Sequence, residues 1–276
     1  MLFALCFLDL FLMQIFGVIA YPVNHSLSPV IHSAALKHLH LNATYKAFDV
    51  EPEKLDLFFS KVKEKKLCLS VSIPYKEKVQ KYCGEISVAA KRIGAVNTIY
   101  WREGKMIGHN TDFIGIRKPL QKVIDLEDKK VTILGAGGTA RAAAYACVLA
   151  GAQVTILNRT VEKAAKIAQI FKCKYNSLDN YDKNTDLIIQ TTSVGLMSDE
   201  SLLTKEDFSE NMVVFDVIYR PQKTQFLKNA EEAGATIITG DQMFLVQACE
   251  QFKLFTGKVA PTEVMEKAFL EAVNDF

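Results

Sequence analysis

The sequence predicts an α/β protein with two domains. A chain of 276 residues is long enough for two domains of ordinary size, and its hydrophobic content of 49% provides each with a core. Short apolar runs alternate with helical stretches along the chain, which is typical of parallel sheets covered by helices. In the second half, a glycine-rich turn joins an apolar run to a helix within residues 131–146. This arrangement indicates a Rossmann-type domain.

The first half predicts alternating strands and helices that end in a hairpin. The hairpin turns at Glu103 and Gly104, and Pro29 stands where the first helix is expected to begin. The expected strands are 16–20, 43–49, 67–71, 98–101 and 105–108, and the expected helices are 30–40, 53–63, 76–83, 88–93 and 112–123.

The second half repeats strand–helix units, which implies a parallel sheet with helices on both faces. We expect a first domain of residues 1–112, completed by helices at 242–276, and a Rossmann-type domain of residues 113–241. The expected strands of this half are 131–134, 153–157, 187–189, 213–216 and 236–238.

The N-terminal 20 residues are almost all apolar and allow two interpretations. A signal peptide or membrane span would suit the composition, but no Lys or Arg precedes the run, and Lys37 is the first after it. The end of the run is typical of a buried parallel strand. We therefore expect Met13 to be the natural start and residues 1–12 to be a dispensable extension.

Charge and cysteine content narrow the function classes. The net charge of +2 gives no electrostatic case for binding nucleic acid or an anionic membrane. The six cysteines form no CxxC pair and no metal-ligand spacing. We expect reduced, mostly buried thiols, a cytoplasmic location and no metal site.

The glycine-rich turn has the spacing of a dinucleotide fingerprint. Gly135 permits the sharp turn, Gly137 lets the backbone approach a pyrophosphate, and Ala140 is small enough for close helix–strand contact. The following helix N-terminus offers free N–H groups to phosphates. A tight turn without a ligand is the alternative. The expected cofactor contacts here are Gly135, Ala136, Gly137, Gly138, Thr139 and Ala140.

The end of the next strand points to NADP rather than NAD. An NAD-binding strand usually ends in an acid that accepts from the ribose hydroxyl, whereas this one is followed by Asn158, Arg159 and Thr160, with Lys163 one turn on. The guanidinium of Arg159 can grip a 2′-phosphate. The alternative, a solvated helix start, suits Lys163 better than Arg159.

From residue 15 onward, a series of short motifs in fixed order resembles the shikimate dehydrogenase family. The motifs are Gly17–Pro22, His25–Pro29 with His32, Val71–Glu77, Gly94–Thr98, Gly108–Asp112, Gly135–Ala140, Asn158–Thr160, Thr191–Gly195, Asp216–Tyr219, and Gly240 with Met243 and Gln247. Many motifs in one order make the resemblance highly specific. It implies an N-terminal α/β substrate-binding domain and an NADP-binding Rossmann-type domain.

The resemblance implies a catalytic pair, Lys76 and Asp112. Ketone reduction needs a hydride and a proton, and a lysine beside a carboxylate can stabilise the developing alkoxide and relay the proton. Lys76 is expected to be the principal acid/base, and Asp112 to position it and bind a ring hydroxyl. Taken alone, Lys76 would be a solvated lysine and Asp112 an N-cap.

The same resemblance implies the remaining contacts. Ser26 and Ser28 would bind the substrate carboxylate, although on its own Ser28 before Pro29 suits a helix N-cap. Taken alone, Asn97 would be a turn residue, Gln247 a surface residue and Met243 a core residue. The other expected substrate contacts are Ser72, Asn97, Tyr219 and Gln247, and the other cofactor contacts are Thr191, Val217, Gly240 and Met243.

One motif departs from the family pattern. Where many members have Asn-Val-Thr, this chain has Ser70, Val71 and Ser72. Ser72 keeps the hydroxyl of threonine, but Ser70 is shorter than asparagine and loses an amide. The departure bears on the geometry of hydroxyl recognition and on discrimination between shikimate and quinate.

The resemblance implies reversible NADP-dependent reduction of 3-dehydroshikimate to shikimate, in aromatic amino-acid and chorismate biosynthesis. We expect a small-molecule substrate, no nucleic acid or membrane partner, and a monomer or homodimer. Two alternatives stay open. One is a quinate/shikimate dehydrogenase with relaxed cofactor use, and the other is a metabolite sensor without turnover, which Lys76, Asp112 and the intact glycine turn disfavour.

Overall fold

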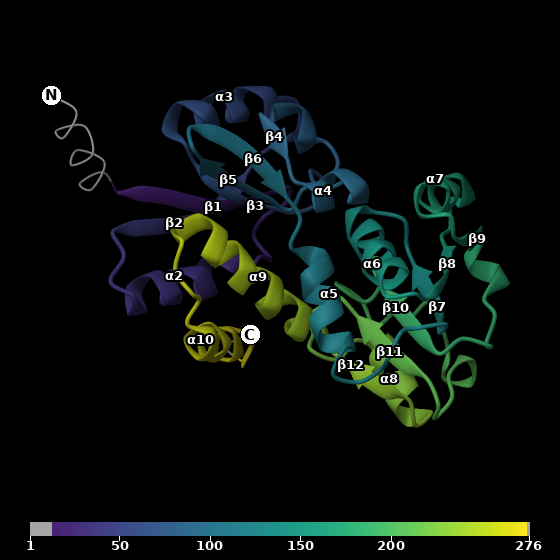
Figure 1. Cartoon of the computed structure of the whole chain (residues 1–276). Coiled ribbons are helices and arrows are strands. Elements are labelled where there is room, and N and C mark those ends of the chain that lie inside the picture. Colours follow the sequence, from purple (N-terminus) through teal and green to yellow (C-terminus); the bar gives the residue numbers. More distant parts are fainter. Residues whose placement is uncertain (1–12, 275–276) are drawn as a thin grey trace, which may run out of the picture. The chain divides into compact units, whose positions relative to one another are not determined.

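A computed structural model describes residues 13–274, so the predicted extension at residues 1–12 lies outside the described residues. The chain divides into two compact units (Figure 1). Unit 1 comprises the described parts of residues 1–87, 96–109 and 248–276, and unit 2 comprises residues 88–95 and 110–247. Each unit contains a six-stranded sheet.

The sheet of unit 1 is mixed and has the strand order β2-β1-β3-β5-β6-β4. Strand β1 is parallel to β2 and β3, whereas β5 is antiparallel to β3 and β6. The predicted hairpin is confirmed, with φ of 51° at Glu103 and 74° at Gly104, the left-handed values of a two-residue turn. The strands are β1 (Gln14–Ala20), β2 (Ala43–Asp49), β3 (Cys68–Val71), β4 (Glu85–Ile86), β5 (Thr98–Arg102) and β6 (Lys105–His109).

Helices cover both faces of this sheet because its strands alternate side chains between them. Phe16 of β1 stacks on Phe255 with ring centroids 5.5 Å apart, and Phe48 of β2 meets Phe58 with centroids 5.2 Å apart. The first contact places α9 on one face and the second places α3 on the other. The helices are α2 (Ser28–His38), α3 (Leu55–Lys65), α9 (Gly240–Thr256), which begins in unit 2, and α10 (Thr262–Asn274) beside α2.

The helix predicted for residues 76–83 is wrong. Only Val79–Tyr82 forms a short 3₁₀ turn, η2. The preceding segment bonds to other parts of the chain instead: the Lys76 carbonyl accepts from Val96 N–H at 2.7 Å, and the buried Tyr75 donates its hydroxyl proton to the Val50 carbonyl. Those long-range bonds take the place of a helical ladder.

The sheet of unit 2 is wholly parallel, with the order β12-β11-β10-β7-β8-β9. This is the doubly wound order of a Rossmann fold and confirms the predicted parallel sheet. The edge strand β9 was not predicted, because its residues are polar and exposed. The strands are β7 (Lys130–Leu134), β8 (Gln153–Leu157), β9 (Lys174–Asn176), β10 (Leu187–Gln190), β11 (Val213–Asp216) and β12 (Thr236–Ile238).

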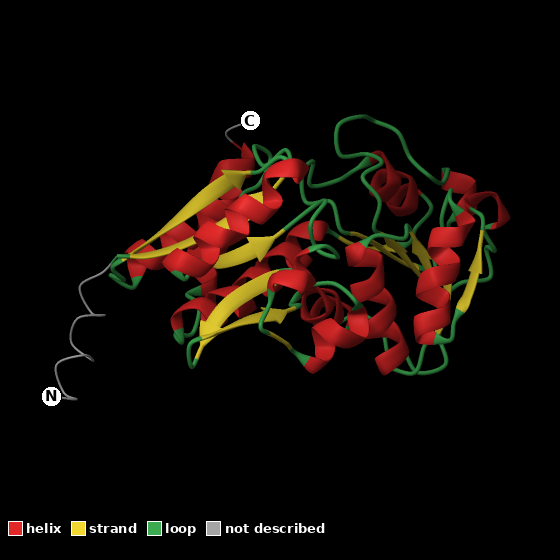
Figure 2. Cartoon of the chain, turned by 90° about the horizontal axis from the view of Figure 1, so that it is seen from above, coloured by secondary structure: helices red, strands yellow, loops and turns green. Residues whose placement is uncertain are grey.

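Helices lie on both sides of this sheet, as expected for a doubly wound fold (Figure 2), and an apolar cluster fills the space on each side. Ile133 and Phe215 belong to the cluster with α5 and α6, whereas Leu134 and Val214 belong to the cluster with α8. Alternate residues of each strand therefore face opposite layers. The helices are α4 (Val88–Ile93), α5 (Asp112–Leu120), α6 (Gly138–Leu149), α7 (Val161–Phe171) and α8 (Gln225–Glu232).

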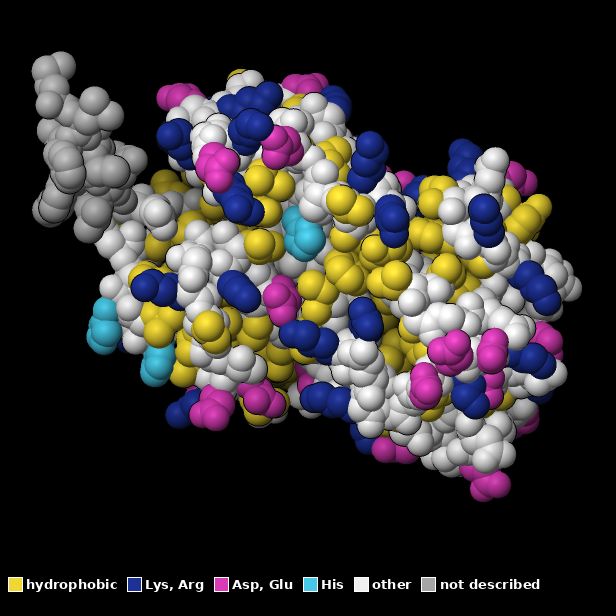
Figure 3. All heavy atoms as spheres, viewed as in Figure 1, with side chains coloured by type: hydrophobic (Ala, Val, Ile, Leu, Met, Phe, Trp, Pro, Cys, Tyr) yellow, Lys and Arg dark blue, Asp and Glu magenta, His cyan; other side chains and the backbone are white. Residues whose placement is uncertain are grey.

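The five cysteines among residues 13–274 are free thiols, with Cys68 and Cys147 buried and the others half-buried. In the same range, no helix combines the length and apolar character needed to cross a membrane. On the face of the molecule seen in Figure 3, lysine and arginine side chains are interspersed with acidic side chains and do not gather into one basic patch.

Candidate functional site

The residues predicted to contact the cofactor follow the carboxyl ends of parallel strands in unit 2. Gly135 follows β7, Asn158 follows β8, Thr191 follows β10 and Val217 follows β11. Parallel strands have their carboxyl ends at one edge of the sheet, and ligands of doubly wound folds bind at that edge, near the strands where the winding reverses. Those strands are β7 and β10.

Gly135 occupies a position that only glycine fits. Its φ is +114°, and a Cβ atom would lie 2.6 Å from Thr191 Oγ1 and 3.1 Å from Thr192 Cγ2. Thr191 cannot give way easily, because its hydroxyl donates to the Leu134 carbonyl at 2.7 Å. The structure therefore packs the glycine turn directly against the loop after β10.

Gly137 differs, because no atom lies within 4 Å of the place a Cβ would take. It is the N-cap of α6, and no side chain caps that helix. Gly137 therefore leaves space beside the start of α6, where the positive end of the helix dipole lies. Ala140 is fully buried, as the fingerprint requires. This arrangement fits a pyrophosphate group.

The turn after β8 presents two cations. Arg159 and Lys163 are exposed, and Thr160 is the N-cap of α7. The Asn158 side chain donates to the Thr160 carbonyl at 2.9 Å, which fixes the turn. An exposed guanidinium with no acid at this strand end suits a 2′-phosphate.

Two buried polar residues to which the sequence analysis assigned no contact, Gln190 and Asp216, shape the neighbouring loops. The Gln190 side chain accepts from Thr192 N–H and donates to the Val194 carbonyl. Asp216 accepts from Ile218 N–H at 3.0 Å and from the Thr224 hydroxyl at 2.6 Å. Each is a polar residue at the end of an apolar strand, which is the signal that could have identified them.

Asp216 holds the loop that leads to Tyr219. Burial raises the pKa of its carboxyl to about 7, against the opposing hydrogen bonds from Thr224 and Ile218. Tyr219 itself stacks on Phe244 of α9, with ring centroids 4.3 Å apart. Gly240 packs on the backbone of this loop, where a Cβ would overlap the Ile218 carbonyl.

Asp112 is buried at the start of α5, with 3% of its surface exposed. Thr111 is the N-cap, so the interpretation of Asp112 as an N-cap is wrong. The backbone N–H of Asp112 instead donates to Asn110 Oδ1, and Asn110 Nδ2 donates to the Ala95 carbonyl, both at 3.0 Å. Two hydrogen bonds thus fix the backbone that carries the carboxylate.

Helices α5 and α9 approach closely where α5 carries Gly115. A Cβ there would lie 2.8 Å from the Met243 carbonyl oxygen and 3.1 Å from Gln247 Cβ. Gln247 is 8% exposed, so the surface interpretation is wrong. Its amide donates to the Phe244 carbonyl at 2.9 Å. The structure therefore brings Met243 and Gln247 next to the helix that begins at Asp112.

In unit 1, Ser26 and Ser28 lie at the start of α2. Leu27 is the N-cap and makes no side-chain cap, so Ser28 is not the N-cap that residue chemistry alone predicts. Ser26 Oγ accepts from the Ser28 N–H at 3.4 Å, and Ser28 is 5% exposed. Two hydroxyls at a helix N-terminus are suited to a carboxylate.

Ser72 and Lys76 lie beyond the end of β3. The Ser72 N–H donates to the Ile19 carbonyl and its carbonyl accepts from Tyr75 N–H, both at 2.9 Å. Lys76 is half-buried in the turn that Tyr75 anchors. Asn97 is 1% exposed, and its backbone bonds to strands on both sides, with the N–H donating to His109 at 3.0 Å and the carbonyl accepting from Val71 at 2.7 Å.

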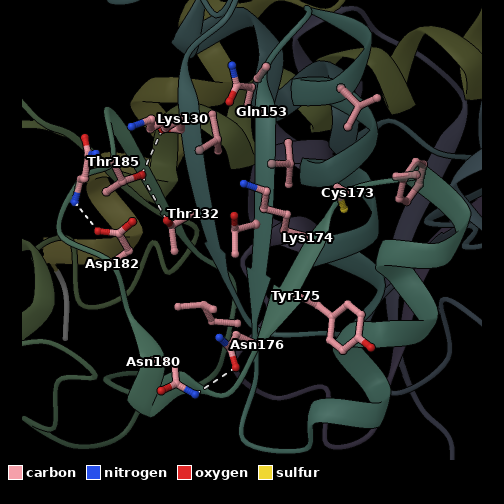
Figure 4. A pocket seen from close by; sticks show the side chains of 18 of the residues that line it. Lys130, Thr132, Gln153, Cys173, Lys174, Tyr175, Asn176, Asn180, Asp182 and Thr185 are labelled. Atoms are coloured by element: carbon pink, nitrogen blue, oxygen red, sulfur yellow. Dashed lines mark hydrogen bonds between the residues drawn. The ribbon is translucent and has the colours of Figure 1, made fainter.

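A separate groove of about 900 Å³ runs along β7, β8 and β9 (Figure 4). It exists because the connection from β9 to β10 contains only a 3₁₀ turn, η3 (Leu178–Asn180), in place of a covering helix. Its lining includes Lys130, Lys174 and Asp182, and none of the predicted site residues. Among residues 13–274, no three potential metal ligands cluster.

Comparison with known proteins covers nearly the whole chain. Residues 18–99 match the shikimate dehydrogenase substrate binding domain, residues 118–219 match shikimate / quinate 5-dehydrogenase, and residues 242–268 match the shikimate 5′-dehydrogenase C-terminal domain. The shikimate dehydrogenase (NADP(+)) of Methanococcoides burtonii is 41% identical over 95% of this chain and 99% of its own length.

Two solved structures are similar in fold as well as sequence. Shikimate 5-dehydrogenase from Thermus thermophilus, in complex with NADP(H) and shikimate, has a TM-score of 0.86 and 35% identity over 94% of this chain and 100% of that one. Quinate dehydrogenase from Corynebacterium glutamicum, in complex with NAD, has a TM-score of 0.86 and 25% identity over 94% and 99%. The chain belongs to the shikimate dehydrogenase family.

Proposed function

We propose that this chain catalyses the reversible NADP-dependent reduction of 3-dehydroshikimate to shikimate. The observation that carries the proposal is the match to NADP-dependent shikimate dehydrogenases along the whole chain, together with a strand-end turn built for a dinucleotide phosphate. The free thiols among residues 13–274 support a cytoplasmic location. A monomer or homodimer stays a prediction.

The cofactor assignment is supported by two features of unit 2. The open space over Gly137 and the uncapped start of α6 suit a pyrophosphate. The exposed Arg159 suits the 2′-phosphate that distinguishes NADP from NAD. Asn158, Thr160, Lys163 and Thr191 would complete the site from the same edge, with Met243 near the nicotinamide. When bound, the cofactor supplies the hydride.

We assign the proton to the pair Lys76 and Asp112. Reduction of the ketone places negative charge on its oxygen, and the Lys76 ammonium would stabilise that charge and deliver the proton. Asp112 would position Lys76 and accept from a ring hydroxyl, on a helix start held by Asn110.

The remaining substrate contacts suit a carbocyclic acid with several hydroxyls. Ser26 and Ser28 would bind the carboxylate, and Ser72, Asn97, Tyr219 and Gln247 would bind hydroxyl groups. A site built from many donors and acceptors rejects analogues that leave them unpaired.

A quinate dehydrogenase is the second candidate, because a family model and a structural relative carry that name. Arg159 and the absent acid after β8 disfavour it, since the relative was solved with NAD. A metabolite sensor is disfavoured by the presence of Lys76 and Asp112.

The proposal is tested by following NADPH absorbance with shikimate and with 3-dehydroshikimate, for the parent and for Lys76→Ala. We expect loss of nearly all turnover with a much smaller loss of shikimate affinity, because the ammonium acts mainly on the transition state. Lys78→Ala, an exposed lysine in the same segment, is the matched control and should retain activity. Full turnover by Lys76→Ala would overturn the assignment.

A further inference from the structure

A chain of buried hydrogen bonds crosses unit 1 through the side chain of Gln251. The Tyr45 hydroxyl donates to Ser70 Oγ at 2.6 Å, and Ser70 Oγ donates to Gln251 Oε1 at 2.7 Å. The Gln251 amide then donates to the Asn97 carbonyl oxygen at 3.0 Å and to Thr98 Oγ1 at 3.1 Å. Every donor in this chain points in the same direction, which strengthens the bonds mutually.

Both ends of this series of hydrogen bonds reach residues that we propose to bind substrate. At one end, Thr98 Oγ1 donates to Asn97 Oδ1 at 2.7 Å. At the other end, burial raises the pKa of Tyr45, and the approaching hydroxyls of Ser70 and Ser28 oppose that rise. This series of hydrogen bonds therefore links the proposed carboxylate-binding end of the substrate site to its proposed hydroxyl-binding end.

The register of the sheet explains why these groups meet. Phe16 pairs with Tyr45 and Val18 pairs with Ser70 across β1, so Tyr45 and Ser70 face the same layer. Helix α9 covers that layer and inserts Gln251, which is 2% exposed. Since Tyr45, Ser70 and Gln251 are buried away from water, each of their polar atoms depends on a partner within the protein.

Gln251 contacts Ser70, one of the two residues at which this sequence differs from the Asn-Val-Thr pattern. Ser70 replaces an asparagine and loses an amide, and the Gln251 amide hydrogen-bonds directly to the Ser70 hydroxyl. We propose that Gln251 is a positioning residue of the substrate site, supplying from α9 the amide that residue 70 lacks. The proposal rests on the proposed function, because it assigns Asn97 and Ser28 to the substrate.

The consequence for the site is a fixed orientation of Asn97. Thr98 Oγ1 donates to Asn97 Oδ1, and the Gln251 amide donates to the Asn97 backbone carbonyl. In this orientation, Asn97 Nδ2 is the atom that would donate to a substrate hydroxyl. Without Gln251, the Asn97 backbone carbonyl and Thr98 Oγ1 each lose the hydrogen bond that the Gln251 amide donates, which weakens the hold on the Asn97 side chain. Substrate affinity then falls while the cofactor residues in unit 2 are untouched.

The experiment compares four proteins: the parent, Gln251→Ala, Ser70→Asn, and the double variant Ser70→Asn/Gln251→Ala. We expect Gln251→Ala to raise KM for shikimate roughly tenfold or more, as for a buried site left with unpaired groups. KM for NADP should change by less than about twofold. Ser70→Asn alone should also raise KM for shikimate, because its amide competes for space with Gln251.

The double variant places an amide at residue 70 and removes the competing amide of Gln251. We expect its KM for shikimate to return to within about threefold of the parent, a non-additive rescue typical of residues in contact. Lys253→Ala, which truncates an exposed residue of the same helix, is the control. Thermal unfolding of all variants separates positioning from loss of fold.

Several outcomes would overturn the proposal. These are an unchanged KM for shikimate in Gln251→Ala, equal changes in KM for both ligands, or a double variant no better than Ser70→Asn alone. If Gln251→Ala does not fold, the comparison of Ser70→Asn with the double variant still decides. A parent that does not turn over shikimate at all would refute the proposed function itself, and this inference with it.

Discussion

Replacing His32 with phenylalanine should make unit 1 less sensitive to acid. His32 lies on α2 with 1% of its surface exposed, and its ring stacks on Tyr45 at a centroid distance of 4.4 Å and an interplanar angle of 3°. Neither ring nitrogen has a hydrogen-bond partner among residues 13–274. Burial lowers the pKa of His32 from 6.5 to about 3, because the charged imidazolium would lose its hydration.

The sign and size of the effect follow from proton linkage. Between pH 6.5 and about 3 the unfolded chain binds a proton at His32 that the folded chain does not. The stability contributed by neutral His32 is therefore complete above pH 6.5 and is lost as the pH falls toward 3. At pH 5, which is 1.5 units below the unfolded value, the loss is about 2 kcal/mol.

Tryptophan fluorescence can measure this loss in unit 1 alone. The chain has one tryptophan, Trp101, which lies in β5 and donates its indole N–H to the Leu67 carbonyl at 3.1 Å. Urea unfolding followed by this signal at pH 7 and pH 5 gives the free energy of unfolding at each pH. We expect His32→Phe to lose about 2 kcal/mol less than the parent between these two pH values.

His38→Phe, which replaces an exposed histidine on the same helix, is the matched control and should follow the parent. Other groups, including His109, titrate alike in parent and variant and cancel in the comparison. If His32→Phe and the parent lose the same stability between pH 7 and pH 5, the buried, unpartnered state of His32 is refuted.

Three further predictions concern unit 2. Gly135→Ala should lower the free energy of unfolding by about 1–3 kcal/mol and weaken NADPH binding at least tenfold in Kd, because φ is +114° and the Cβ would lie 2.6 Å from Thr191 Oγ1. Gly137→Ala should weaken NADPH binding in a fluorescence titration but lower the free energy of unfolding by about 0.5 kcal/mol or less, since no atom lies within 4 Å of its Cβ position. Equal losses of stability in the two variants would contradict this contrast. Arg159→Gln should raise KM for NADP roughly 10- to 100-fold, as expected when hydrogen bonds to a charged group are lost, and should leave KM for NAD unchanged. Equal changes in KM for the two cofactors would contradict the assignment of Arg159 to the 2′-phosphate. Between pH 6 and pH 8 the parent should lose about 1 kcal/mol of unfolding free energy, because a carboxyl whose pKa is raised to about 7 stabilises the fold at low pH and less as the pH rises. Asp216→Asn should not show this loss when urea unfolding is followed by circular dichroism at the two pH values. A variant that loses as much stability as the parent would contradict the burial of that carboxyl.

Much of the fold could be predicted because local patterns and the fold agree. The parallel strands of unit 2 are short apolar runs bounded by turns, and β8 begins and ends at the predicted residues, Gln153–Leu157. The hairpin at Glu103 and Gly104 follows from local turn chemistry. The failures lie where long-range bonds decide, as in residues 76–83, whose backbone bonds to Val96 rather than within a helix.

The candidate site could be predicted where a motif has a local mechanism. The roles of Gly135 and Ala140 follow from turn geometry, and the structure gives both the expected environment. The capping interpretations of Ser28 and Asp112 are wrong because the residue before each one takes the cap position. Sequence spacing of this kind cannot separate N-cap from N1 by a single residue.

Gln251 could not be found by local reasoning. It lies 181 residues from Ser70 along the chain, and the two meet only because α9 packs on the sheet of unit 1. The one available signal was the departure at Ser70, which shows that an amide is missing but not which residue supplies another. That question needs the register of β1 with β2 and β3 and the position of α9.

The most direct test of the central claim is a comparison of kcat/KM for four substrate and cofactor pairs. Shikimate and quinate are each assayed with NADP and with NAD by absorbance of the reduced cofactor. We predict that shikimate with NADP gives the largest kcat/KM, because Arg159 follows β8 without an acid. A larger kcat/KM for quinate with NAD, or no turnover of shikimate with either cofactor, would contradict the account.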